Sequence, residues 1–281
     1  MIFEIVPNLS EGRNEATIDA AIDAVQACGA RVLHRTSDAA HHRSVLTIAG
    51  NGEQVLEAAV ALAGVAVERI DLRTHRGVHP RIGALDVLPF VPLAGATMEQ
   101  AVALAHRAGA RIWERWQIPS FFYGEAALRT ERRLLAEVRR GEFEGLQERF
   151  TAPGWAPDVG DIARHPGAGA IAIGAREVLV AFNIELADGD LALAKRIAGT
   201  LRERGGGFQT LRALGLPLTA GRVQISLNVT CYAATPLYRI LEVVRTLAAE
   251  RGARVANSEL IGCLPLEAAA AAASYYLGIG P

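Results

Sequence analysis

The stretch RTHRGVHPRIGALDVLPF, residues 73–90, places two histidines and three arginines directly before a run apolar enough to form a buried strand. Pro80 disfavours the α conformation at His79, so an extended histidine is expected there beside Arg81. Such a histidine could act as a general base near neutral pH, and Gly83 would let a ligand approach the backbone. The alternative is a surface histidine bonded to its own loop. The pattern alone favours that alternative, because few histidines are catalytic.

His75 and His79 are also candidates for a metal site, because they are four residues apart. Two histidines four residues apart on a helix can bind zinc. Here Gly77 lies between them, Pro80 follows His79, and no glutamate follows His75. The sequence therefore predicts no metal.

Other polar residues follow segments that are expected to be strands. PNLSEGR, residues 7–13, offers polar groups that could bind a ligand or cap the next helix. FFYGEAAL, residues 121–128, repeats this order of strand, polar turn and helix. HPGAGA, residues 165–170, is rich in glycine but lacks the lysine of a P-loop and precedes a strand, so nucleotide phosphate binding is not predicted.

Two asparagines lie inside apolar strands, Asn183 in VAFNIEL and Asn228 in ISLNVT. A buried asparagine needs hydrogen-bond partners, so each is expected to be a node in the core or a ligand contact. Residues 129–140 form a charge-rich segment, which is expected to be the solvated face of a helix or a docking strip for an acidic tail.

The composition limits the class of protein. The chain has 281 residues, of which 51% are hydrophobic, and its formal net charge is −1. This charge gives no global field for nucleic acid or a membrane, and no segment is apolar enough to span a bilayer. The N-terminus has no signal-peptide pattern, and the three cysteines have neither metal nor disulfide spacing. A cytoplasmic protein that binds small molecules, and forms a homodimer through apolar sheet surfaces, is expected.

The periodicity predicts the order β-α-β-β-α-β twice. In the first half, strands are expected at residues 3–6, 31–35, 44–49, 84–91 and 120–123, and helices at 15–27, 54–67, 97–116 and 126–140. Residues 141–175 are expected to be irregular. In the second half, strands are expected at 178–186, 211–214, 223–229 and 254–258, and helices at 191–204, 236–250 and 266–276.

This pattern predicts an α+β fold of two tandem ferredoxin-like subdomains, residues 1–175 and 176–281, with a ligand groove between them. The residues alone go no further than a two-lobed protein that binds a small polar ligand.

The motifs taken together resemble those of the glutamate formiminotransferases, the formiminotransferase half of formiminotransferase-cyclodeaminase. The matching stretches span nearly the whole chain and are VPNLSEGR, GVHPRIGALDVLPFVP, YGEAA, WAPD, IGAREVLVAFNIEL, RGGGFQTLRALG, QISLNVT and NSELIGCLPLEA. No cyclodeaminase part follows them, so the chain resembles the stand-alone form.

The resemblance implies a transferase that moves a formimino group from N-formimino-L-glutamate to tetrahydrofolate in histidine degradation, without a metal. It places the catalytic histidine of the family at His79 and its folate-binding loop at residues 160–169. The residues that we expect to bind the donor substrate are Asn8, Ser10, Glu11, Arg43, Arg81, Gly83, Tyr123, Gly124 and Glu125. Those that we expect to bind folate are Gly160, Arg164, His165, Pro166, Gly167, Gly169, Asn183 and Asn228.

Two positions depart from the family pattern. Where the family has an aspartate at the end of its second strand, this chain has Thr36, and Asp38 two residues later keeps the same face and could assist His79. Where the family has an aspartate after Ser-x-Asn-x-Thr, this chain has Cys231. The loss of two acidic groups leaves two alternatives open: formyl transfer from N-formylglutamate, and a folate-binding paralogue without turnover.

Overall fold

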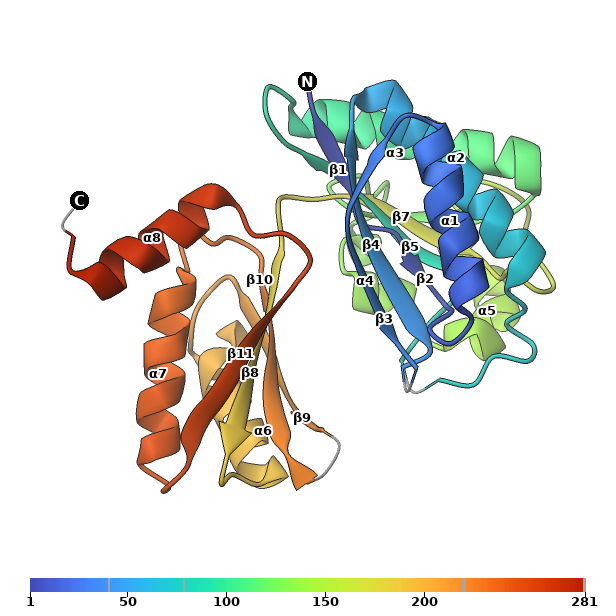
Figure 1. Cartoon of the computed structure of the whole chain (residues 1–281). Helices are drawn as coiled ribbons and strands as arrows, with labels where there is room; N and C mark the ends of the chain where they lie inside the picture. The colour runs from blue at the N-terminus through green and yellow to red at the C-terminus, as the bar shows by residue number, and fades with distance from the viewer. Residues whose placement is uncertain (40, 78, 219–220, 280–281) are drawn as a thin grey trace. The chain divides into compact units, whose positions relative to one another are not determined.

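The computed structural model describes residues 1–39, 41–77, 79–218 and 221–279. The chain divides into two compact units, Met1–Arg176 and Glu177–Pro281 (Figure 1). Each unit contains helices and strands in the order β-α-β-β-α-β, and the prediction of two tandem α+β subdomains is confirmed. No helix among the described residues is long and apolar enough to cross a membrane.

The first unit is built on a seven-stranded sheet. Its antiparallel part runs in the order β5, β1 with β2, β4 and β3, and the parallel strands β7 and β6 extend it beyond β5. Pro7 separates β1 from β2, because proline has no N–H for the ladder. The strands are β1 (Phe3–Ile5), β2 (Asn8–Leu9), β3 (Arg31–Asp38), β4 (Arg43–Gly50), β5 (Leu85–Pro92), β6 (Ser120–Gly124) and β7 (Ile171–Ala175).

Apolar residues cover both faces of this sheet. The larger core packs α1 (Glu15–Ala27), α2 (Gly52–Arg69) and α3 (Met98–Trp116) against one face. Figure 1 shows these three helices side by side. A smaller cluster joins β5, β6 and β7 to α4 (Leu135–Val138) and α5 (Glu142–Thr151).

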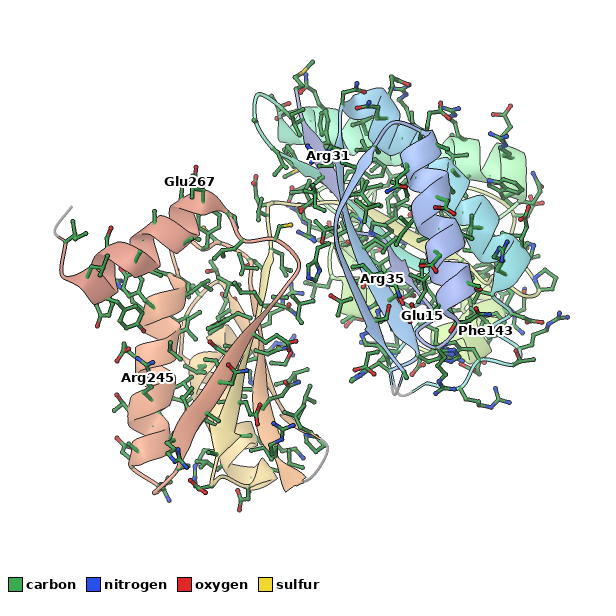
Figure 2. All side chains as sticks on the ribbon, viewed as in Figure 1. Glu15, Arg31, Arg35, Phe143, Arg245 and Glu267 are labelled. Carbon is green, nitrogen blue, oxygen red and sulfur yellow. The ribbon has the colours of Figure 1, made fainter. Side chains whose placement is uncertain are left out.

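Local signals at the helix ends agree with the structure. Thr97 and Gln100 form a capping box at the start of α3, and Asn51 and Gln54 form another at α2. Figure 2 shows Glu15 of α1 beside Arg35 of β3, and the two side chains form an ion pair.

Three predictions for the first unit are wrong. The helix expected at residues 126–140 is reduced to the 3₁₀ turn η1 (Thr130–Arg132) and α4. The irregular stretch expected at 141–175 contains α5 and β7. The charge-rich segment is also not a solvated face, because Arg132 is 1% exposed and the side chain of Arg139 is 15% exposed. Tertiary ion pairs hold these arginines, and such contacts override local helix propensity.

The second unit has a four-stranded antiparallel sheet in the order β11-β8-β10-β9. Its strands are β8 (Val180–Ala187), β9 (Leu211–Pro217), β10 (Val223–Val229) and β11 (Arg254–Ile261). The helices are α6 (Leu191–Leu201), α7 (Leu237–Ala249) and α8 (Leu266–Leu277), with a 3₁₀ turn η2 (Glu203–Gly205) after α6. The core lies between the sheet and α6 and α7.

Candidate active site

Asp86 of β5 is the centre of a buried charge cluster, which we call the Asp86 cluster: Asn8, Arg43, His79, Asp86 and Arg139. Asp86 is fully buried. Its Oδ2 accepts hydrogen bonds from Nη1 of Arg43 at 2.8 Å and Nη2 of Arg139 at 2.5 Å, and its Oδ1 accepts one from the Ile82 amide at 2.8 Å. Arg43 also donates to Oδ1 of Asn8 from Nε and Nη2. The cluster therefore joins three strands to the residue that follows α4.

The balance of charge in this cluster is uneven. Burial alone would raise the pKa of Asp86, but the two guanidinium groups outweigh burial and lower it, so Asp86 is ionised at neutral pH. Two guanidinium cations then face one carboxylate. The cluster is left with one unbalanced positive charge.

His79 lies next to this unbalanced charge. Its Nδ1 is 2.8 Å from the carbonyl of Pro80, and a carbonyl only accepts, so Nδ1 carries the hydrogen and Nε2 carries the lone pair. Burial, together with the charges of Arg43 and Arg139, lowers the pKa of His79 to about 4, although Asp86 and the bond to Pro80 act in the opposite direction. His79 is therefore a neutral imidazole at physiological pH, with Nε2 able to accept a proton.

Asp38 is connected to His79 through His41. The Oδ2 of Asp38 is 2.9 Å from Nδ1 of His41, and its Oδ1 accepts the His41 amide hydrogen at 2.8 Å. The ring of His41 meets that of His79 edge-on, with centroids 6.2 Å apart. Asp38 could thus influence His79 by positioning His41.

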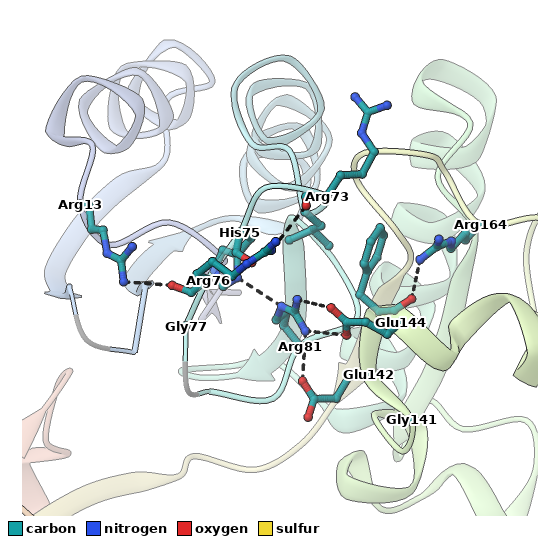
Figure 3. Close-up of a pocket in the computed structure, with 12 residues that line it drawn as sticks. Arg13, Arg73, His75, Arg76, Gly77, Arg81, Gly141, Glu142, Glu144 and Arg164 are labelled. Carbon is teal, nitrogen blue, oxygen red and sulfur yellow. Dashed lines mark hydrogen bonds and ion pairs between the residues drawn. The ribbon is translucent and has the colours of Figure 1, made fainter.

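A second group of charges lines a pocket of about 1130 Å³, which we call the basic pocket (Figure 3). His79 does not line it. Arg81 donates to Glu142 at 3.1 Å and to both carboxylate oxygens of Glu144, at 2.9 and 2.7 Å. The other arginines that line the pocket are Arg13, Arg73, Arg76 and Arg164.

Both ring nitrogens of His75 are engaged beside this pocket. Arg81 donates from Nε to Nδ1 of His75 at 3.2 Å, so Nδ1 is an acceptor. The Nε2–H of His75 then donates to the carbonyl of His42 at 3.0 Å. No group of three or more metal-ligating side chains occurs among the residues that the structure describes.

The loop at residues 7–13 precedes α1, whose N-cap is Asn14. The Oε1 of Glu11 accepts from the amides of Arg13 and Asn14 and from Nε2 of His42. Burial opposes ionisation of Glu11, but these bonds and the charge of His42 lower its pKa overall. Ser10 is buried and donates to the carbonyl of Gly83 at 2.7 Å.

The segment expected to bind folate packs against the loop that carries His79. The amide of Ala84 donates to Ala168 at 2.9 Å, and that of Ala170 donates to Ile82 at 3.0 Å. A Cβ at Gly83 would lie 2.1 Å from the carbonyl oxygen of Ala170. The absence of a side chain at Gly83 therefore lets the backbone at Ala170 pack closely against it. His165 accepts the Ala168 amide at Nδ1, which closes the turn at residues 165–169.

Several further residues of this segment have structural partners. Leu72 donates to the Gly167 carbonyl, and Arg164 donates to the Phe143 carbonyl at 2.5 Å. Gly160 and Gly169 both adopt positive φ, +99° and +71°. Pro166 lies within the same turn.

Residues 123–125 lie at the end of β6. Tyr123 is buried, and burial raises the pKa of its hydroxyl. Gly124 has φ +65° where the chain turns past Ala175. The Glu125 carboxylate is half exposed and forms an ion pair with Arg133 at 2.5 Å.

The two asparagines of the second unit are not core residues, and that interpretation is wrong for both. Along β8 and β10 the buried positions alternate with polar ones, and Asn183 and Asn228 lie on the face opposite α6 and α7. Asn228 is exposed, and Nδ2 of Asn183 reaches Oε2 of Glu259 at 3.5 Å. Asn183 also lines a shallow pocket of about 280 Å³ with Glu185, Gln224 and Glu259.

The sequence analysis missed Asp86 and Arg139. Asp86 carried a visible signal, because it is an acidic residue inside the apolar run ALDVLPF. An ionised side chain at such a position needs a buried partner. Arg139 carried no such signal, because it stands among other charged residues.

The fold and the site define a class: an α+β protein of two units, with a neutral histidine beside a buried arginine–aspartate cluster. The sequence matches the family described as the formiminotransferase domain, N-terminal subdomain, over residues 2–176. Residues 181–279 match the family described as the formiminotransferase domain.

Curated relatives agree with these matches. The chain is 41% identical to glutamate formimidoyltransferase of Streptococcus pyogenes serotype M1, over 99% of this chain and 94% of the relative. It is 40% identical to the protein of that name from Thermoplasma acidophilum, over 98% and 92%. Formimidoyltransferase-cyclodeaminase of Rattus norvegicus is 38% identical over 98% of this chain but 52% of the relative. The chain belongs to the formiminotransferase domain family, and the resemblance read from its motifs is confirmed.

Proposed function

We propose that this protein transfers the formimino group of N-formimino-L-glutamate to tetrahydrofolate, as a step in histidine degradation. Relatives of similar length carry the name glutamate formimidoyltransferase and align over nearly the whole chain. The structural observation that carries the proposal is the state of His79. It is neutral, its Nδ1–H is held by the Pro80 carbonyl, and its Nε2 is left to accept a proton.

The reaction needs one group that moves protons. The N5 nitrogen of tetrahydrofolate bonds to the formimino carbon, and the bond from that carbon to the glutamate nitrogen breaks. His79 accepts the proton that N5 loses and then protonates the departing glutamate nitrogen, so that His79 ends the cycle neutral. General acid–base catalysis of this kind typically contributes about 10²–10⁴ in rate.

The proposal assigns the remaining residues as the family resemblance does. Asp38 assists His79 through His41, for which the 2.9 Å contact gives the route. The donor is assigned to Asn8, Ser10, Glu11, Arg43, Arg81, Gly83, Tyr123, Gly124 and Glu125. Folate is assigned to Gly160, Arg164, His165, Pro166, Gly167, Gly169, Asn183 and Asn228. The subdomain division at residues 175 and 176, a cytoplasmic location and a homodimer belong to the same proposal, and sedimentation of the purified protein tests the last.

A second candidate is formyl transfer from N-formylglutamate, and one observation favours it. A protonated formimino group is cationic, and the carboxylates expected to hold it are engaged elsewhere. The Glu11 carboxylate accepts hydrogen bonds from the Arg13 and Asn14 amides, and Glu125 forms an ion pair with Arg133. A neutral formyl group would need neither carboxylate.

One assay separates these candidates. Purified protein is incubated with tetrahydrofolate and either N-formimino-L-glutamate or N-formyl-L-glutamate, and turnover is compared for wild type, His79→Ala and the control His34→Ala. We expect turnover with the formimino donor, a loss of about 10²–10⁴ in kcat for His79→Ala, and wild-type rates for the control. Turnover with the formyl donor alone would replace the proposed donor. Tight folate binding without turnover would support a binding protein.

A further inference from the structure

The Asp86 cluster has a charge that its own residues do not balance. Building on the function proposed above, we propose that Arg139, together with Arg43, binds the α-carboxylate of the donor substrate. The expected ligand is thus the carboxylate attached to the carbon that bears the departing glutamate nitrogen.

The first argument is the charge count. Asp86 is the only carboxylate that receives hydrogen bonds from Arg43 and Arg139 among the described residues. Neutral His79 contributes nothing to compensate them. An unpaired charge in a buried setting is costly, so the site favours an anion as its missing partner.

The second argument is the state of the Arg139 guanidinium. Its Nε is buried and has no hydrogen-bond partner among the described residues, so Asp86 leaves it incompletely satisfied. The side chain nevertheless remains 15% exposed, whereas Arg43 is 8% exposed and donates to both Asn8 and Asp86. Arg139 is therefore the member of the pair that an incoming carboxylate can reach.

The third argument is the chemistry of the donor. In N-formiminoglutamate the α-carboxylate lies two bonds from the nitrogen that His79 must protonate. An anion site that acts electrostatically on His79 therefore fits the α-carboxylate, because the carbon of the γ-carboxylate lies four bonds from that nitrogen. Guanidinium groups are suited to carboxylates because they donate in a planar fork.

Arg81 is a weaker candidate for this role. It already pairs with two carboxylates, Glu142 and Glu144, so its charge is matched by its own partners. An incoming carboxylate would have to displace one of them.

The binding of an anion here has a consequence for His79. The charged and titratable groups that act on it are Arg43, Arg139, Asp86 and the ring of His41. A bound carboxylate would offset the unbalanced positive charge and raise the pKa of His79 from about 4 toward neutrality. A base is most effective when its pKa is near the working pH, so the donor would improve the base that acts on it.

The test uses three donors on the full-length protein: N-formimino-L-glutamate, its α-carboxamide and its γ-carboxamide. For wild type, we expect the α-carboxamide to lower kcat/KM by about ten- to a hundredfold, which is typical for the loss of a charged hydrogen bond. The γ-carboxamide should lower it less. In Arg139→Gln, kcat/KM for N-formimino-L-glutamate should fall to the value that wild type has for the α-carboxamide. Arg139→Gln should cause no further loss of kcat/KM when the α-carboxamide is the donor.

The matched control is Arg140→Gln, because Arg140 is the exposed neighbour that pairs with Glu137. It should behave as wild type with all three donors. Arg139→Lys keeps the charge without the fork and guards against misfolding of the glutamine variant. If Arg139→Gln lowers kcat/KM by the same factor for N-formimino-L-glutamate and for its α-carboxamide, the proposal is overturned, because an equal loss would indicate a structural role.

A second readout does not need turnover. Titration of His79 by NMR, with and without N-formyl-L-glutamate as the probe, should show a higher midpoint with N-formyl-L-glutamate in wild type but not in Arg139→Gln. No shift in wild type would overturn the inference. If wild type has the same kcat/KM for N-formimino-L-glutamate and its α-carboxamide, only the assignment of the α-carboxylate is refuted. If no formimino donor is turned over, the proposed function is refuted.

Discussion

Arg43 and Arg139 share one buried carboxylate, whereas Arg81 holds two carboxylates that are largely exposed. The first group therefore carries a surplus positive charge, whereas the charge of Arg81 is matched by its own partners. Asp86 is fully buried, but the side chains of Glu142 and Glu144 are 44% and 64% exposed. The same residue types thus produce a charge that water cannot screen at one place, and a solvated ion pair at the other.

The difference explains why His79 and not His75 is the candidate base. His75 uses Nδ1 to accept from Arg81 and Nε2–H to donate to the His42 carbonyl, so it holds the loop. His79 uses only its Nδ1–H on the Pro80 carbonyl, and the surplus charge beside it disfavours protonation. Position relative to the buried charge, rather than residue type, separates a structural histidine from a reactive one.

The largest effect is expected from a substitution in the buried Asp86 cluster. Asp86→Asn removes the anion that both guanidinium groups contact among the described residues. Breaking a buried ion pair from one side typically costs about 3–5 kcal/mol, so we expect a loss of that size in the free energy of unfolding. Urea unfolding followed by circular dichroism measures it. A loss below about 1 kcal/mol would mean that the cluster is solvated.

Asp38 provides a smaller test, since it acts on His79 only at a distance. Asp38→Asn should lower kcat by about tenfold or less, because it removes a positioning contact to His41 and not the base. Its midpoint of unfolding should stay near that of wild type, since the side chain is about half exposed. A rate identical to wild type in a turnover assay would show that Asp38 does not replace the aspartate that the family has at Thr36.

The smallest effect is expected at the basic pocket. Glu144→Gln leaves Arg81 paired with Glu142, and exposed ion pairs contribute about 0–1 kcal/mol. Its urea midpoint should therefore almost match that of wild type. A loss comparable to that of Asp86→Asn would remove the contrast between the two groups.

Much of the fold was predictable because local signals and tertiary packing agree. The helix expected at 54–67 appears as Gly52–Arg69, and the strands at 84–91 and 223–229 appear as Leu85–Pro92 and Val223–Val229. In these elements the periodicity matches the buried face, so local reasoning finds them.

The wrong predictions concern residues whose structure is determined by contacts with residues far away in the sequence. Residues 126–140 have the composition of a helix, but Arg132 forms an ion pair with Asp158 and Arg139 forms one with Asp86. The helix is interrupted between these two arginines. Asn183 and Asn228 looked buried because their neighbours are apolar, but alternation along the strand turns them to the other face. Arg139 could not be singled out, because only its partner 53 residues away distinguishes it.

The most direct test of the account is the titration of His79 itself. The Nε2 of a histidine beside a surplus positive charge should remain unprotonated over the physiological range, and NMR of the imidazole signals, assigned with His79→Gln, follows its state. The account predicts a midpoint near pH 4 in the free protein, which moves to higher pH in Arg139→Gln because one neighbouring cation is removed. A midpoint near pH 6.5, the ordinary value, in both proteins would contradict it.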